Sequence, residues 1–134
     1  TKTNGVGNWR MKRIRIQDGM YNAEIYQIVN VKHDELLKFF QKKYKHIFPD
    51  DADFDGMHYL LSNPKNGMKY HFIIIYSYNK DSKDDFSILD HEITHLMFSV
   101  LDIAGIKYDS EHSEEAYTYY HSYMMTKFYK ILHK

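Results

Sequence analysis

DFSILDHEITHLMFSVLDIA, residues 85–104, is the stretch from which the fold can be worked out. Its apolar residues recur at intervals of three and four, which predicts an amphipathic helix packed on a sheet. They are Phe86, Leu89, Ile93, Leu96, Met97, Val100 and Leu101. Ser82 or Asp84 is expected to cap this helix, and Gly105 is expected at the position just after its end.

The segments before this helix predict the sheet. Residues 9–17 alternate between two faces, one of them basic, and residues 21–31 give a weaker second strand. Residues 57–61 and 68–78 are typical of a hairpin. The core of its second strand, FIIIY at 72–76, is apolar on both faces, so we expect it in the middle of the sheet.

Two further helices are expected. One is capped by Asp34, runs to about His46 and is ended by Pro49; its apolar stripe is Leu36, Leu37, Phe39, Phe40, Tyr44 and Ile47. The other is capped by Ser113 and runs to about Leu132, with Ala116, Tyr119, Tyr120, Tyr123 and Phe128 on its apolar side. The fold class is therefore α+β, with an antiparallel or mixed sheet followed by the 85–104 helix and a C-terminal helix.

Composition bounds the class of protein. The 134 residues predict one domain at 9–134 after a flexible arm at 1–8. Lys plus Arg and Asp plus Glu both total 18, which argues against nucleic acid as a partner despite the basic residues near 10–15. No apolar run approaches the roughly 18 residues of a membrane span, and no signal-peptide pattern is present. Cysteine is absent, which excludes thiolate ligands and fits a cytoplasmic location.

The acidic run DDADFDG at 50–56 contains the D-x-D-x-D-G opening of a calcium loop. The twelfth position of such a loop needs a bidentate Glu, and Ser62 stands there. An acidic surface loop is therefore the favoured interpretation.

Residues 90–95, DHEITH, contain the side chains that could bind a metal ion. His91 and His95 are four apart, so a helix places both imidazoles on one face, where a single Zn²⁺ can take a nitrogen from each. Glu92 lies beside the pair, where it can remove a proton from a metal-bound water. The alternative is a pair of half-exposed histidines without a metal.

Two imidazoles do not hold zinc tightly, so a third protein ligand is expected, with water as the fourth. No His stands at the metzincin spacing, where Leu101 lies. Glu114 and Glu115 open the next helix. Glu115 is favoured because it precedes Ala116 on the packed side, whereas Glu114 points toward solvent; either could instead be a helix N-terminal carboxylate.

HEITH at 91–95 followed by Glu115 resembles the gluzincin kind of zincin metallopeptidase, and the interval from His95 to Glu115 is similar to that in thermolysin-like peptidases. Residues 91–123 also resemble small HExxH proteins of bacteriophage genomes. The resemblance implies a small zincin-like domain with one Zn²⁺, held by His91, His95 and Glu115, and with Glu92 as catalytic base. Tyr119 replaces the Asp found there in thermolysin-like enzymes, so the surroundings of the third ligand must differ.

The function predicted is that of a zinc metallopeptidase acting on a protein or peptide, in a host cytoplasm or during phage assembly. Side chains that could stabilise the oxyanion or bind substrate are Tyr108, His112, Tyr120 and His121, although core or rim packing is the favoured interpretation of each Tyr. An exposed edge strand could bind an extended peptide. The alternative is a non-catalytic phage or virion protein that keeps the zinc site for structure or binding.

Overall fold

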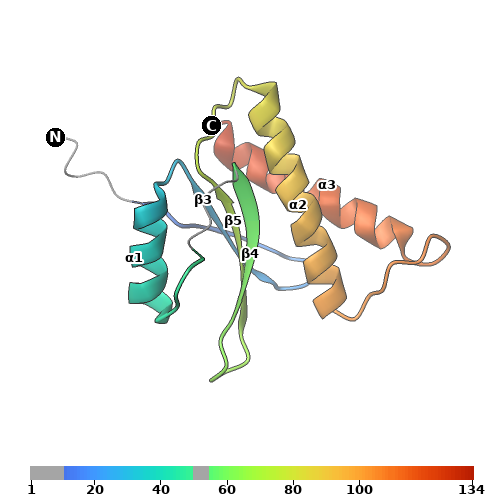
Figure 1. Ribbon diagram of the computed structural model, residues 1–134. Helices are drawn as coiled ribbons and strands as arrows, with labels where there is room; N and C mark the ends of the chain where they lie inside the picture. The colour runs from blue at the N-terminus through green and yellow to red at the C-terminus, as the bar shows by residue number, and fades with distance from the viewer. Residues whose placement is uncertain (1–10, 50–54) are drawn as a thin grey trace.

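One mixed sheet with helices on both faces makes up the described chain, residues 11–49 and 55–134 of a computed structural model (Figure 1). The elements in chain order are β2 (Ile14–Ile16), β3 (Glu24–Val29), α1 (His33–Tyr44), β4 (Gly56–Ser62), β5 (Lys69–Ile75), α2 (Lys83–Ile103) and α3 (Glu114–Leu132). Helix α1 covers one face of the sheet, and α2 and α3 cover the other. This arrangement confirms the α+β class.

The sheet has the strand order β2-β3-β5-β4. The two inner strands, β3 and β5, are parallel, while β2 and β4 pair antiparallel with them on the outside. Strand β5 is buried on both faces, as predicted: Ile73 and Ile75 pack toward α2 and α3, and Phe72 and Ile74 pack toward α1. The strand expected at 9–17 covers only 14–16, and its first residues lie outside the described chain.

Helix α1 differs from its prediction at both ends. Its N-cap is Lys32, not Asp34, and the backbone N–H of Lys32 donates to the Glu35 carboxylate at 2.9 Å. It ends before Lys45, which adopts a left-handed φ of 54°, so Pro49 does not terminate it. Ile47, expected in the apolar stripe, lies beyond the helix and is 84% exposed.

Helix α2 agrees closely with the prediction. It starts after Ser82, whose hydroxyl accepts a hydrogen bond from the Asp85 N–H at 3.2 Å, and it ends just before Gly105, which has a φ of 84°. The predicted stripe is buried except for Phe86, which lies near the exposed start of the helix. No described helix is both long and apolar enough to cross a membrane.

Helix α3 packs through a stripe that matches the prediction in part, since Tyr120 and Phe128 are buried and Tyr123 packs against the core as expected. Its buried residues are Tyr117, Tyr120, Met124 and Phe128, whereas Tyr119 is 63% exposed. Ser113 occupies the N-cap position, but its hydroxyl donates to the Lys107 carbonyl at 2.6 Å and makes no capping bond to the helix.

Asp18 ties the turn between β2 and β3 to α3. Its buried carboxylate accepts hydrogen bonds from the backbone N–H groups of Met20, Tyr21 and Ala23 and from the Tyr120 hydroxyl. A buried carboxylate is tolerated when its oxygens are satisfied in this way. The contact fixes α3 against the sheet, and α3 in turn packs on α2.

Candidate metal centre

Helix α2 brings His91, Glu92 and His95 together, as the sequence predicts. The Nε2 atoms of the two histidines are 3.2 Å apart, and their rings meet edge to face at 79°. One ligand atom from each of the three side chains lies within 4.8 Å of the other two. Both histidines are exposed, whereas Glu92 is only 7% exposed, so the carboxylate lies beneath the imidazoles.

The spacing of the two imidazoles fits a zinc ion. Tetrahedral Zn²⁺ with Zn–N bonds of roughly 2.0–2.1 Å holds two ligand nitrogens about 3.3 Å apart. The observed Nε2–Nε2 separation of 3.2 Å matches this value. His91 and His95 can therefore occupy two corners of a zinc tetrahedron with little movement.

His91, Glu92 and His95 line a cleft of about 480 Å³ between α2 and β4. Its lining residues are Gly56, Met57, His58, Leu60, His91, Glu92, His95 and Ser99. Because Gly56 has no side chain, β4 can lie close to α2: a Cβ there would be 3.0 Å from Ile88 Cγ2 and 3.5 Å from Glu92 Cγ. The face of α2 that carries the His-Glu-His group therefore lies beside the outer strand of the described sheet.

Glu92 has the electrostatic setting of a proton acceptor. Burial raises the pKa of its carboxyl, while the nearby His91 and His95 rings and a hydrogen bond from the His58 backbone N–H act in the opposite direction. Burial dominates, so the pKa is raised overall. A carboxylate with a raised pKa is better matched to receiving a proton from a water near neutral pH.

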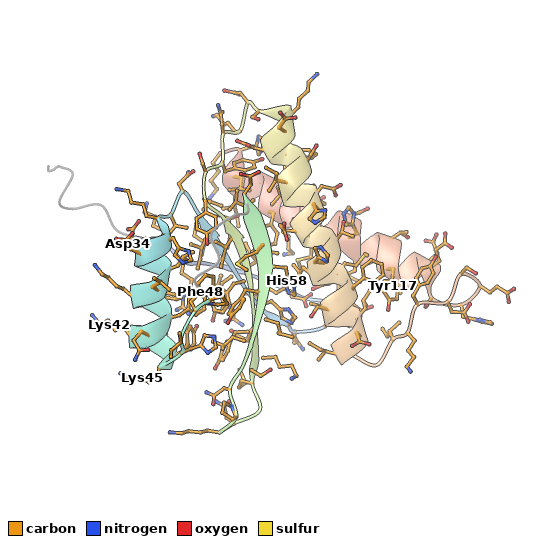
Figure 2. All side chains as sticks on the ribbon, in the orientation of Figure 1. Asp34, Lys42, Lys45, Phe48, His58 and Tyr117 are labelled. Carbon is orange, nitrogen blue, oxygen red and sulfur yellow. The ribbon has the colours of Figure 1, made fainter. Side chains whose placement is uncertain are left out.

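A second pair of histidines, which the sequence does not single out, consists of His58 in the cleft lining and His71 on the neighbouring strand. His58 Nε2 and His71 Nδ1 are 3.0 Å apart, and Figure 2 shows His58 on the side of β4 that faces α2. Burial lowers the pKa of His58 to about 3 and that of His71 to about 4, so both rings are neutral at pH 7. The pairing register of β4 with β5 puts His58 and His71 on the same face of the sheet. The sequence alone does not show that this face meets His91 and His95.

The buried His71 predicts that the metal-free protein loses stability in acid. Its pKa falls from 6.5 to about 4 on folding, so between these values the unfolded chain binds a proton that the folded chain does not. Stability therefore falls as the pH falls through this window, by about 2 kcal/mol between pH 7 and 4.5 from His71 alone. Urea unfolding at several pH values measures the change.

His71→Leu is the control, because it removes the part of the loss that is due to His71 and leaves the part due to His58, whose pKa also falls on folding, so the stability of the variant should fall less steeply with pH. The other groups that influence His71 are His58 on β4, Asp18 and Lys69, and they remain in this variant. An equal loss of stability in the variant would contradict the assignment.

The structure does not bring the predicted third ligand to the metal group. Among residues 11–49 and 55–134, that group contains His91, Glu92 and His95 alone. Glu115 is exposed at the start of α3, and Glu114, also exposed, accepts a hydrogen bond from the Tyr108 hydroxyl at 3.3 Å. Metal binding by Glu115 or Glu114 stays a prediction.

Two of the predicted oxyanion or substrate residues belong to the connection between α2 and α3. Tyr108 is 53% exposed and bonds Glu114, and His112 Nδ1 lies 2.9 Å from an Asp109 carboxylate oxygen. Neither residue lines the cleft.

The other two are on α3 and also lie outside the cleft lining. Tyr120 is fully buried, and its hydroxyl donates to Asp18 at 3.0 Å. His121 Nε2 is 2.8 Å from Asp90 Oδ1, so it joins α3 to the residue that precedes His91. These contacts give both side chains a role in holding α3 in place.

No protein-family model, curated protein or solved structure matches the chain. The interpretation of the site therefore rests on its geometry alone. That geometry is a His-Glu-His group that could hold a metal ion, on a helix that lies beside an outer strand. This group is consistent with an HExxH motif.

Proposed function

We propose that this protein is a zinc-dependent hydrolase that cleaves peptide bonds. The observation that carries the proposal is the 3.2 Å separation of the His91 and His95 Nε2 atoms, with Glu92 beside them at the floor of an open cleft. Two imidazole ligands and a neighbouring carboxylate are among the parts that metal-assisted hydrolysis requires.

Each of the three residues has a distinct role. His91 and His95 would hold Zn²⁺ through Nε2, and the bound ion supplies an acidified water and polarises a carbonyl. Glu92 would accept a proton from the attacking water and later donate it to the leaving amine. Its burial and its raised pKa support this role, because a raised pKa makes the carboxylate a better proton acceptor.

The backbone of β4 supports an extended peptide as substrate. Hydrogen bonds from Tyr76 N–H to Asp55 O and from Asn63 N–H to Met68 O bracket the strand. Antiparallel pairing alternates, so the backbone groups of Gly56, His58 and Leu60 are directed away from β5, toward the outer edge. The His58 N–H in this set donates to Glu92, which places the edge and the proposed base side by side.

A peptide added along this edge would therefore run past Glu92 and the histidine pair. Main-chain hydrogen bonds to the strand would supply binding without a demand for one sequence. A protein or peptide in extended conformation is accordingly the substrate that we propose.

Metal content and hydrolysis test the proposal. We expect one zinc per chain, cleavage of a mixed peptide library read by mass spectrometry, and loss of cleavage with 1,10-phenanthroline that added zinc restores. His91→Ala should lose both properties, whereas His133→Gln, at the C-terminal end of the chain, should keep them. Absence of stoichiometric zinc would contradict the proposal. Zinc without cleavage would instead favour a non-catalytic zinc-binding protein.

A further inference from the structure

His58 is the side chain of the cleft that can add a nitrogen ligand to His91 and His95. The remaining lining residues offer no imidazole or carboxylate beyond Glu92: they are Gly56, Met57, Leu60 and Ser99. Met57 packs into the cluster on the opposite face of the sheet. Since two imidazoles alone hold zinc weakly, the cleft needs a further protein ligand, and His58 is the candidate within it.

The strand geometry directs His58 toward α2. Alternate residues of β4 face opposite sides of the sheet, and His58 lies on the side that carries the cleft. Its backbone N–H contacts Glu92, and its ring is near enough to His95 that a charge on His95 lowers the His58 pKa. His58 and His95 therefore approach each other from the strand and the helix.

His71 provides a reason for the orientation of His58. A His that binds zinc through one ring nitrogen normally bonds a fixed partner through the other, which sets its tautomer and direction. His58 Nε2 is bonded to His71 Nδ1, and this leaves Nδ1 of His58 for a metal. His71 is 2% exposed on a central strand, where an imidazole is costly unless it serves such a contact.

We propose that His58 is the third protein ligand of the zinc ion, with His71 as its orienting partner. The proposal rests on the metal site proposed above but not on peptidase activity. His58 is not part of the group whose ligand atoms lie within 4.8 Å, so its ring must move toward α2 when the metal binds. Glu115 is the competing ligand; it is exposed on α3 and does not line the cleft.

Zinc affinity, measured by competition with a chromophoric chelator, tests the assignment. We expect His58→Gln to weaken zinc binding about 100-fold or more, because one of three protein ligands is lost. His71→Gln should weaken binding about 10-fold, as for partners of a metal-bound His. Glu115→Gln should change the affinity less than about 2-fold, since a surface substitution outside the site has little effect. Thermal unfolding confirms that each variant is folded.

A cysteine at position 58 gives a positive signal that does not depend on a loss of affinity. The chain has no cysteine, so a thiolate-to-cobalt absorption band in Co²⁺-loaded His58→Cys shows that residue 58 contacts the metal. Ser62→Cys, exposed near the end of the same strand, is the matched control and should show no band.

The results separate the two proposals. A band in His58→Cys together with weak binding in His58→Gln supports His58 as ligand. Unchanged affinity in His58→Gln with a loss in Glu115→Gln overturns it but keeps the metal centre. A wild-type protein that binds zinc no better than His91→Ala would remove the metal centre itself.

Discussion

Replacing Glu92 by Gln is expected to lower the rate of peptide hydrolysis about 10³-fold, because the amide cannot accept a proton. The substitution keeps the size of the side chain, and its amide can still accept the hydrogen bond from the His58 backbone N–H. Zinc affinity should remain close to wild type, since His91 and His95 are unchanged. Rates on a cleaved peptide, together with metal analysis of the same sample, separate the two properties.

The matched control is Glu111→Gln, which makes the same chemical change at an exposed position between α2 and α3 and should leave the rate unaltered. Glu92→Asp withdraws the carboxylate by one methylene and should give a rate between those of wild type and Glu92→Gln. Full hydrolysis in Glu92→Gln would mean that another group removes the proton. Loss of zinc in that variant would mean that Glu92 is a ligand and not the base.

The His-Glu-His group could be predicted from the sequence because its three residues lie close together in the chain, on one helix. A spacing of four places His91 and His95 on one face of a helix, and the stripe from Leu89 to Leu101 predicts that helix and its packed side. The structure keeps the helix within about two residues of its expected ends, as is usual for a strongly periodic segment. The α+β class followed from the same local patterns.

What could not be predicted depends on contacts between distant segments. The sequence predicts the hairpin of β4 with an inner β5, but it does not show that β4 is the outer strand and that its His58 side faces α2, which is what brings His58 to the cleft. In α3, Tyr119 and Tyr117 both fit an apolar stripe at three and four residue spacing, and only packing on Phe98 shows that Tyr117 is the inner one. Lys45 ends α1 in a left-handed conformation. Residues other than glycine rarely adopt this conformation, so a Lys in the sequence does not predict the end of a helix.

Gly56→Val is expected to destabilise the fold by about 3 kcal/mol and to disturb the cleft. A Cβ at this position would lie 3.1 Å from the Ile74 carbonyl oxygen and 3.0 Å from Ile88 Cγ2. The Ile74 oxygen belongs to the backbone of β5, so it cannot move without loss of strand pairing. The strand must therefore shift away from α2, and the His58 N–H would be drawn away from Glu92. Urea unfolding measures the first effect.

The consequence for the site is that zinc binding and hydrolysis should both fall, since β4 carries His58, the proposed third ligand, and the N–H that bonds Glu92, while His91 and His95 keep their spacing on α2. Gly56→Ala adds only the Cβ and should cost about 1 kcal/mol, which keeps the variant folded for kinetic work. Ser62→Val, near the exposed end of the same strand, introduces the same side chain without the contact and should change stability by less than about 0.5 kcal/mol. Equal stability of Gly56→Val and Ser62→Val would show that β4 is free to move, and the close approach of the strand to Glu92 would then have no role in holding the base.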